Sequence, residues 1–159
     1  FAPVVLLVPI LWQLPQGLRG RYSDFRGERP IIGSLYANGQ DPGNVLLYGP
    51  DKQTFIALIR EYDTHRRDTA VRAERLLKDE SIADVCRRYR VGEIVLEFAP
   101  GDGVRQQPEL HGLASAKDFQ PDFDRTYDRR GQNMTVLGFR YTGPKDAKMA
   151  DIPLSKDLL

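Results

Sequence analysis

Between residues 44 and 98, the sequence alternates between short apolar runs and segments whose apolar residues recur at helical spacing. A run such as 44–49, which is apolar and bounded by turn residues, is typical of a strand buried on both faces. This alternation constrains the fold most, because it predicts parallel strands joined by right-handed crossover helices. The expected elements are strands at 44–49, 69–73 and 93–98 and helices at 55–62 and 82–89.

Two helix starts are indicated by capping residues. Pro30 can occupy the first position of a helix over 30–36, because the N–H that proline lacks would be unpaired there in any case. Ser81 predicts the N-cap of the helix at 82–89, and Asp84 three residues later completes a variant of the capping box.

The C-terminal part of the sequence predicts an antiparallel strand pair. Residues 134–141 have the composition of a strand, 119–127 could form an edge strand, and 128–133 contain turn residues between them. Residues 108–116 are a candidate third helix. The fold class expected from the whole pattern is α/β, with a small, mostly parallel, three-layer, Rossmann-like sheet and a C-terminal antiparallel hairpin.

The first twelve residues contain no charge and are mostly apolar. A membrane span needs about 20 apolar residues, so this run is too short to cross alone. It fits the C-terminal half of a spanning helix, with Trp12 at the interface and Arg19 and Arg21 among the headgroups. The alternative is a buried strand or core helix. We expect the membrane interpretation, in which the α/β body is preceded by the end of a transmembrane helix.

This interpretation divides the chain into four parts. Because the sequence begins with phenylalanine rather than methionine, we expect it to come from a longer protein. The expected partners are the lipid bilayer, contacted through residues 1–12, and the remainder of the parent membrane protein. The four parts are the end of a transmembrane helix at 1–19, a linker and short helix at 20–43, a soluble α/β domain at 44–143 and a C-terminal tail at 144–159.

Charge and cysteine content exclude several classes of function. The 23 basic and 22 acidic residues leave a net charge of +1, so no overall field recruits nucleic acid, and we expect no nucleic-acid partner. With 41% hydrophobic residues and so little net charge, the composition is not that of a disordered chain. The single cysteine, Cys86, excludes an internal disulfide and a zinc site with several thiolates.

The loop at 49–54 joins a strand to a helix, where free N–H groups can attract phosphate. It contains Lys52 but lacks the second glycine of a phosphate-binding loop, and Asp51 would repel phosphate. We therefore interpret it as an ordinary turn in which Asp51 or Thr54 caps the helix.

Glu97 and Asp102 lie at or beyond the end of the third expected strand. If a ligand binds this domain, the carboxyl ends of the parallel strands are its expected position. Position alone is not evidence of chemistry, so we assign no residue as catalytic, cofactor-binding or metal-ligating, and we expect no cofactor.

Other side chains that could take part in chemistry have simpler structural interpretations. The basic group His65-Arg66-Arg67 could meet a lipid phosphate, but we expect a solvated helix end. His111 lacks partner ligands, and Cys86 is expected to be a buried small hydrophobe rather than a reactive thiol. A loose acidic group lacks the spacing of a calcium loop. It consists of Asp118, Asp122, Asp124 and Asp128.

The stretch that begins Leu46-Leu-Tyr-Gly-Pro and runs to Asp63, with the segment from Ile82 to Glu97, resembles the C-terminal soluble region of GT-C class membrane glycosyltransferases. These are the dolichyl-phosphate-mannose-protein mannosyltransferase-like proteins. The resemblance covers most of residues 44–154. It implies a preceding apolar helix end and a parent that transfers sugar from a lipid phosphate. In that class the catalytic acidic residues lie in an early loop between membrane helices, so the resemblance assigns none to this chain.

The function that we expect is an accessory extracytoplasmic domain of an integral membrane glycosyltransferase that uses a lipid-phosphate-linked sugar donor. The catalytic residues would lie in the upstream membrane part, and the domain would lie on the periplasmic or extracellular side of the membrane. A lipid-linked sugar or an acceptor is a further candidate partner. The alternative is a soluble α/β binding module without catalytic activity, and a small standalone enzyme ranks third.

Overall fold

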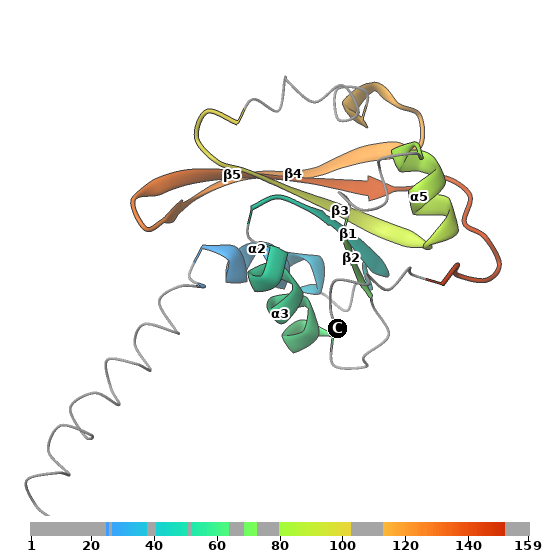
Figure 1. Cartoon of the computed structure of the whole chain (residues 1–159), viewed down its shortest axis with the longest axis horizontal. Coiled ribbons are helices and arrows are strands. Elements are labelled where there is room, and N and C mark those ends of the chain that lie inside the picture. Colours follow the sequence, from blue (N-terminus) through green and yellow to red (C-terminus); the bar gives the residue numbers. More distant parts are fainter. Residues whose placement is uncertain are drawn as a thin grey trace, which may run out of the picture.

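The computed structural model describes residues 25, 27–37, 41–50, 52–63, 69–72, 80–102 and 113–151. Within this part of the chain, a five-stranded mixed sheet has the strand order β2-β1-β3-β5-β4 and is covered by helices on both faces (Figure 1). The elements are α2 (Glu28–Leu35), β1 (Asn44–Tyr48), α3 (Lys52–Tyr62), β2 (Ala70–Arg72), α5 (Ile82–Arg88), β3 (Val91–Phe98), the short 3-10 helix η3 (Leu113–Ser115), β4 (Phe119–Arg129) and β5 (Gln132–Tyr141).

One half of the sheet is parallel and the other half is antiparallel. Strand β1 pairs in parallel with both β2 and β3, as the alternation of strands and helices predicts. Strand β3 pairs antiparallel with β5, and β5 pairs antiparallel with β4. The α/β class and the C-terminal hairpin are thus confirmed, but the prediction of a mostly parallel sheet holds only for one half, because the hairpin joins the same sheet through β3.

Strand β3 lies at the centre of the sheet, and all eight of its residues are buried. Its successive side chains point to opposite faces, as in any strand. Ile94, Leu96 and Phe98 pack in a cluster that includes the apolar face of α5. Val95 packs in a second cluster, which includes apolar residues of α2 and α3. Figure 1 shows α2 and α3 on one side of the sheet and α5 on the other.

Helix α2 begins at Glu28, two residues before the start that Pro30 predicts. Glu28 is buried, and Gly27 before it lies so close to the Tyr127 ring of β4 that a Cβ atom there would be 2.2 Å from a ring carbon. The start of α2 is therefore packed onto the sheet. An ion pair between Arg29 and Glu61 then connects α2 with α3.

Helix α5 begins as its capping residues predict. The Ser81 hydroxyl accepts a hydrogen bond from the Asp84 backbone N–H at 3.2 Å. At the other end, the segment after β5 turns back, so that the N–H groups of Asp146 and Ala150 donate to the carbonyls of Arg87 and Arg88 at 3.1 and 3.0 Å. These bonds satisfy carbonyls that a helix end leaves without intrahelical partners.

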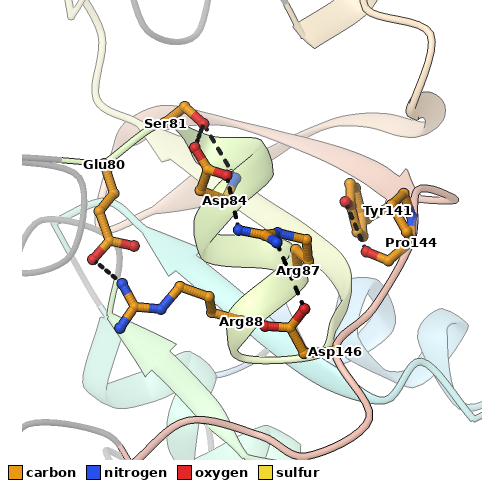
Figure 2. A network of polar contacts seen from close by, with 8 residues as sticks. All are labelled: Glu80, Ser81, Asp84, Arg87, Arg88, Tyr141, Pro144 and Asp146. Carbon is orange, nitrogen blue, oxygen red and sulfur yellow. Dashed lines mark hydrogen bonds and ion pairs between the residues drawn. The ribbon is translucent and has the colours of Figure 1, made fainter.

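Charged side chains on α5 add surface contacts to this arrangement. Figure 2 shows the Arg87 side chain between Asp84, one turn earlier, and Asp146 of the returning segment. Arg88 pairs with Glu80 just before the helix. The part of the predicted C-terminal tail that the structure describes, through residue 151, is thus attached to the fold.

The predicted turn between β4 and β5 is a two-residue hairpin loop. Its residues, Arg130 and Gly131, have φ values of 53° and 82°. Two consecutive positive φ values are characteristic of a type I′ turn, whose twist matches that of the flanking strands. The strands extend to Arg129 and begin again at Gln132, so the turn is shorter than the six-residue segment expected from composition.

The described residues contain no helix that is both long and apolar enough to cross a membrane. The predicted end of a transmembrane helix at 1–19 falls outside the described residues, as does most of the candidate helix at 108–116. The fold described above therefore does not test either prediction.

Candidate functional site

Strand β3 places two glutamates on the sheet face that α2 and α3 cover, separated by Val95. Each of these side chains, Glu93 and Glu97, has only 1% of its surface exposed. Burying a carboxylate is costly unless hydrogen bonds or opposite charges compensate for the lost water. Helix α2 extends between them. Its first residue, Glu28, contacts Tyr127, which is also a partner of Glu97, and its last residue, Leu35, lies beside Glu93.

The carboxylate of Glu97 lies in a closed environment. It accepts a hydrogen bond from the Tyr127 hydroxyl of β4. Burial raises the pKa of Tyr127, and its contacts with Glu97 and then Glu28 raise it further. Gly49, which has a φ of +144°, leaves no free space on this side, because a Cβ atom there would lie 2.6 Å from that of Glu97. Glu28, Glu97 and Tyr127 thus form a buried polar cluster.

Glu93, at the other end of the strand, has a looser environment. Its Oε2 atom is 3.7 Å from Nε of Arg140, the residue opposite it on β5. Arg140 Nη2 is in turn 3.5 Å from Asp122 Oδ2. Both distances exceed those of ordinary N–H···O hydrogen bonds. The Glu93 Oε1 atom is buried and has no hydrogen-bond partner among the described residues.

A bulge in β4 positions Asp122 beside this guanidinium. Pro121 pairs with Phe139 and Phe123 pairs with Gly138, so Asp122 between them is the extra residue. Bulges of this kind redirect a side chain and are frequent next to functional sites.

Burial raises the pKa of Glu93 to about 7. The Asp122 carboxylate raises it too, while the Arg140 guanidinium acts in the opposite direction. A carboxyl group with this pKa is present in both protonation states near neutral pH. It can therefore either donate or accept a hydrogen bond there.

Glu93 and Arg140 line a cleft with a volume of about 270 Å³. Two main-chain segments of its lining approach closely, because a Cβ atom on Gly92 would lie 1.9 Å from the Pro42 carbonyl oxygen and 3.3 Å from Lys145 Nζ. Only glycine fits at this position of β3. The cleft is lined by Leu35, Asp41, Pro42, Gly92, Glu93, Arg140, Tyr141 and Lys145.

The cleft lies at the amino-terminal end of the parallel strands. Pro42 precedes β1, Glu93 is the third residue of β3, and Arg140 lies near the end of the antiparallel β5. The position expected for a ligand is the carboxyl ends of the strands, where the loops after β1 and β3 lie. There the structure shows the closed cluster around Glu97 and a turn in which Asp102 Oδ2 accepts from the Ala99 N–H at 3.3 Å.

Several residues considered in the sequence have structural roles. Cys86 is fully buried, and burial raises the pKa of its thiol to about 12, which confirms the interpretation as a small hydrophobe. Thr54 lies within α3, which begins at Lys52 and is thus longer than predicted. Asp51, the basic group at 65–67 and His111 fall outside the described residues.

Three of the four aspartates of the acidic group have different partners. Asp122 pairs with Arg140, the Asp128 carboxylate accepts from the Gly131 N–H at 3.2 Å, and the Asp118 main-chain carbonyl accepts from the Thr142 N–H at 2.9 Å. In the described part of the chain, no group of three or more metal-binding side chains comes together.

The Glu93–Arg140 pair is not predicted from the sequence. A signal was available, since each is a charged residue with apolar neighbours in its strand. The partner of each could not be read from sequence, because the register between β3 and β5 depends on a chain segment of more than 30 residues between them.

No protein family model matches the chain, and no curated protein matches it. Among solved structures, it is weakly similar to a candidate tRNA (m1A22) methyltransferase of Streptococcus pneumoniae in complex with S-adenosyl-L-methionine. The identity is 12% and the TM-score is 0.28, with 80% of this chain and 64% of that chain covered. This chain thus spans less than two thirds of that protein. A similarity at this level carries no argument about function.

Proposed function

We propose that this chain is an accessory extracytoplasmic domain of an integral membrane glycosyltransferase that uses a lipid-phosphate-linked sugar donor. The observation that carries the proposal is the uncharged run at 1–12, which ends in Trp12 and precedes an α/β body. The resemblance of residues 44–154 to the soluble region of GT-C class enzymes is the reason for proposing a glycosyltransferase as the parent. The catalytic residues would belong to the upstream membrane part of the parent.

The described fold adds a limit on distance to this proposal. Phe25 packs against the core, and Gly27 and Glu28 follow against the sheet, so the body begins by residue 25. Twelve residues separate Trp12 from Phe25, and an extended chain of that length spans at most roughly 45 Å. The body would therefore lie close to the membrane surface on the extracytoplasmic side, where it could cover the loops of the parent. We also propose that this body is Rossmann-like and follows the end of a transmembrane helix.

Vesicle flotation tests the membrane part of the proposal. The full chain should float with phospholipid vesicles, whereas the double variant Val5→Asp/Leu7→Asp should remain at the bottom of the gradient, because two charges in the apolar run oppose its insertion. The matched control is Gln53→Asp/Thr126→Asp, which adds the same charges at exposed positions of α3 and β4 and should still float.

A full chain that is monodisperse without detergent and does not float would contradict the membrane assignment. It would favour the alternative, a soluble α/β binding module without catalytic activity. The coding region upstream of Phe1 provides a second test of the parent. It should encode several hydrophobic spans with an acidic extracytoplasmic loop between early ones, and a soluble upstream region would overturn the transferase assignment.

A further inference from the structure

The cleft beside Glu93 has a small volume and a mixed polar lining. Its volume of about 270 Å³ lies just below the range of roughly 300–1,000 Å³ that is usual for drug-sized ligands. The lining combines hydrogen-bond donors, Arg140 and Lys145, with carboxylate acceptors, Asp41 and Glu93. A ligand for this cleft should be small and should have donors and acceptors close together.

The charges around the cleft disfavour a fully charged ligand. An anion would be attracted by Arg140 and Lys145 but would face the carboxylates of Asp41 and Glu93, with Asp122 behind the guanidinium. A cation would meet the opposite difficulty. A neutral ligand avoids both repulsions and the cost of removing a charge from water.

Hydroxyl groups match this lining best, because each hydroxyl both donates and accepts a hydrogen bond. Two neighbouring hydroxyls can donate a hydrogen bond to a carboxylate while their oxygens accept hydrogen bonds from a guanidinium or an ammonium group. The buried Oε1 of Glu93, which has no partner among the described residues, is an acceptor that such a hydroxyl would satisfy. Leu35 and Pro42 provide an apolar wall for the C–H groups of the same ligand.

We infer that this cleft binds a neutral, hydroxyl-rich ligand of the size of one sugar ring, with Glu93 and Arg140 as its central contacts. Arg140 is half-exposed, its Nε atom lies 3.7 Å from the buried Glu93 carboxyl, and both residues line the cleft. Asp41 and Lys145, both exposed, contact the ligand at the rim. The inference rests on the cleft and not on the membrane assignment.

Protein-observed NMR of the full chain with methyl hexosides tests the inference. Binding in the millimolar range should shift the amide signals of Gly92, Glu93 and Lys145. The variant Lys145→Gln, which changes an exposed side chain, should weaken binding about tenfold, equivalent to about 1.4 kcal/mol. Glu93→Gln should weaken it as well, because an amide oxygen replaces a carboxylate as the acceptor. The control Glu61→Gln, on exposed α3 surface away from the cleft, should bind as the unchanged chain does.

Three results would overturn the inference. They are the absence of shifts with any methyl hexoside, shifts that persist undiminished in both cleft variants, and shifts at these amides with inorganic phosphate or glycine but not with the hexosides. Flotation with vesicles is measured separately, so loss of the membrane assignment and loss of the sugar site are distinguishable outcomes.

Discussion

Glu93 and Glu97 occupy the same strand, point to the same face of the sheet and are equally buried, yet their environments differ. Glu97 receives a hydrogen bond from Tyr127 in a site with no space beside it. Glu93 has a guanidinium at 3.7 Å, an oxygen without a partner among the described residues, and a cleft next to it. Burial alone thus does not indicate whether a buried charge is structural. The completeness of its hydrogen bonds and the space around it do.

The largest expected effect is the pH dependence of stability that arises from Glu93. Its pKa is about 7 in the folded protein and 4.5 in a model peptide, so the folded state binds the proton more tightly than the unfolded chain. The contribution of Glu93 to stability is then fully present below pH 4.5 and is lost as the pH rises through 7, by about 3 kcal/mol in all. The charged groups facing Glu93 are Asp122, Arg140, Asp41 and Lys145, from β4, β5 and the segments before β1 and after β5.

Urea unfolding at a series of pH values measures this term. The Glu93→Gln variant should lose most of the decrease between pH 4.5 and 7, because its amide does not titrate. A Glu97→Gln variant is the control from the closed site. If the stability of the Glu93→Gln variant depends on pH as that of the unchanged chain does, the contrast between the two glutamates is wrong.

The next largest effect is expected from Tyr127→Phe in the closed site. The substitution removes the donor to the buried Glu97 carboxylate and should lower the free energy of unfolding by about 2 kcal/mol. Tyr141→Phe is a matched control, because it removes a single bond to the Pro144 carbonyl and should cost about 1 kcal/mol. Equal losses of unfolding free energy in the two variants would indicate that the hydrogen bond to Glu97 stabilises the fold no more than a bond between neutral groups.

The smallest effect is expected from Arg140→Gln. The guanidinium lowers the pKa of Glu93, so its removal should raise that pKa further. Because Arg140 is 46% exposed and screened by solvent, the stability change at pH 8 should stay below about 1 kcal/mol. Carbon-detected NMR titration of the Glu93 carboxyl group measures the shift, and Arg125→Gln on the exposed face of β4 should leave it unchanged.

The sequence predicted the parts of the fold that depend on local patterns. The buried strand β1, the capped start of α5 and the C-terminal hairpin each follow from residues that are close together in the chain. The mixed character of the sheet did not follow, because no local pattern specifies that β5 pairs with β3. The same limit applies to the candidate site, since Glu93, Arg140 and Asp41 approach one another only through pairing across β1, β3 and β5 and their loops.

The cleft lies at the opposite end of the parallel strands from the position expected for a ligand, and this difference has a physical reason. In an open parallel sheet, ligands usually bind at the carboxyl ends of the strands. Here Gly49 brings the main chain against Glu97 and leaves no space there, whereas Gly92 and Pro42 leave a cleft at the opposite end. These close approaches depend on tertiary packing, and a single sequence does not reveal them.

The two-residue loop at Arg130 and Gly131 has a consequence for the order of folding. It makes the β4–β5 pairing the most local long pairing of the sheet, while the parallel pairings of β1 need longer loops to close first. We expect the hairpin to form early, β3 to pair with its strand β5 next, and β2 to be added last. Substitutions in the hairpin such as Val136→Ala should then slow folding, whereas Val71→Ala in β2 should mainly accelerate unfolding, as stopped-flow kinetics can measure.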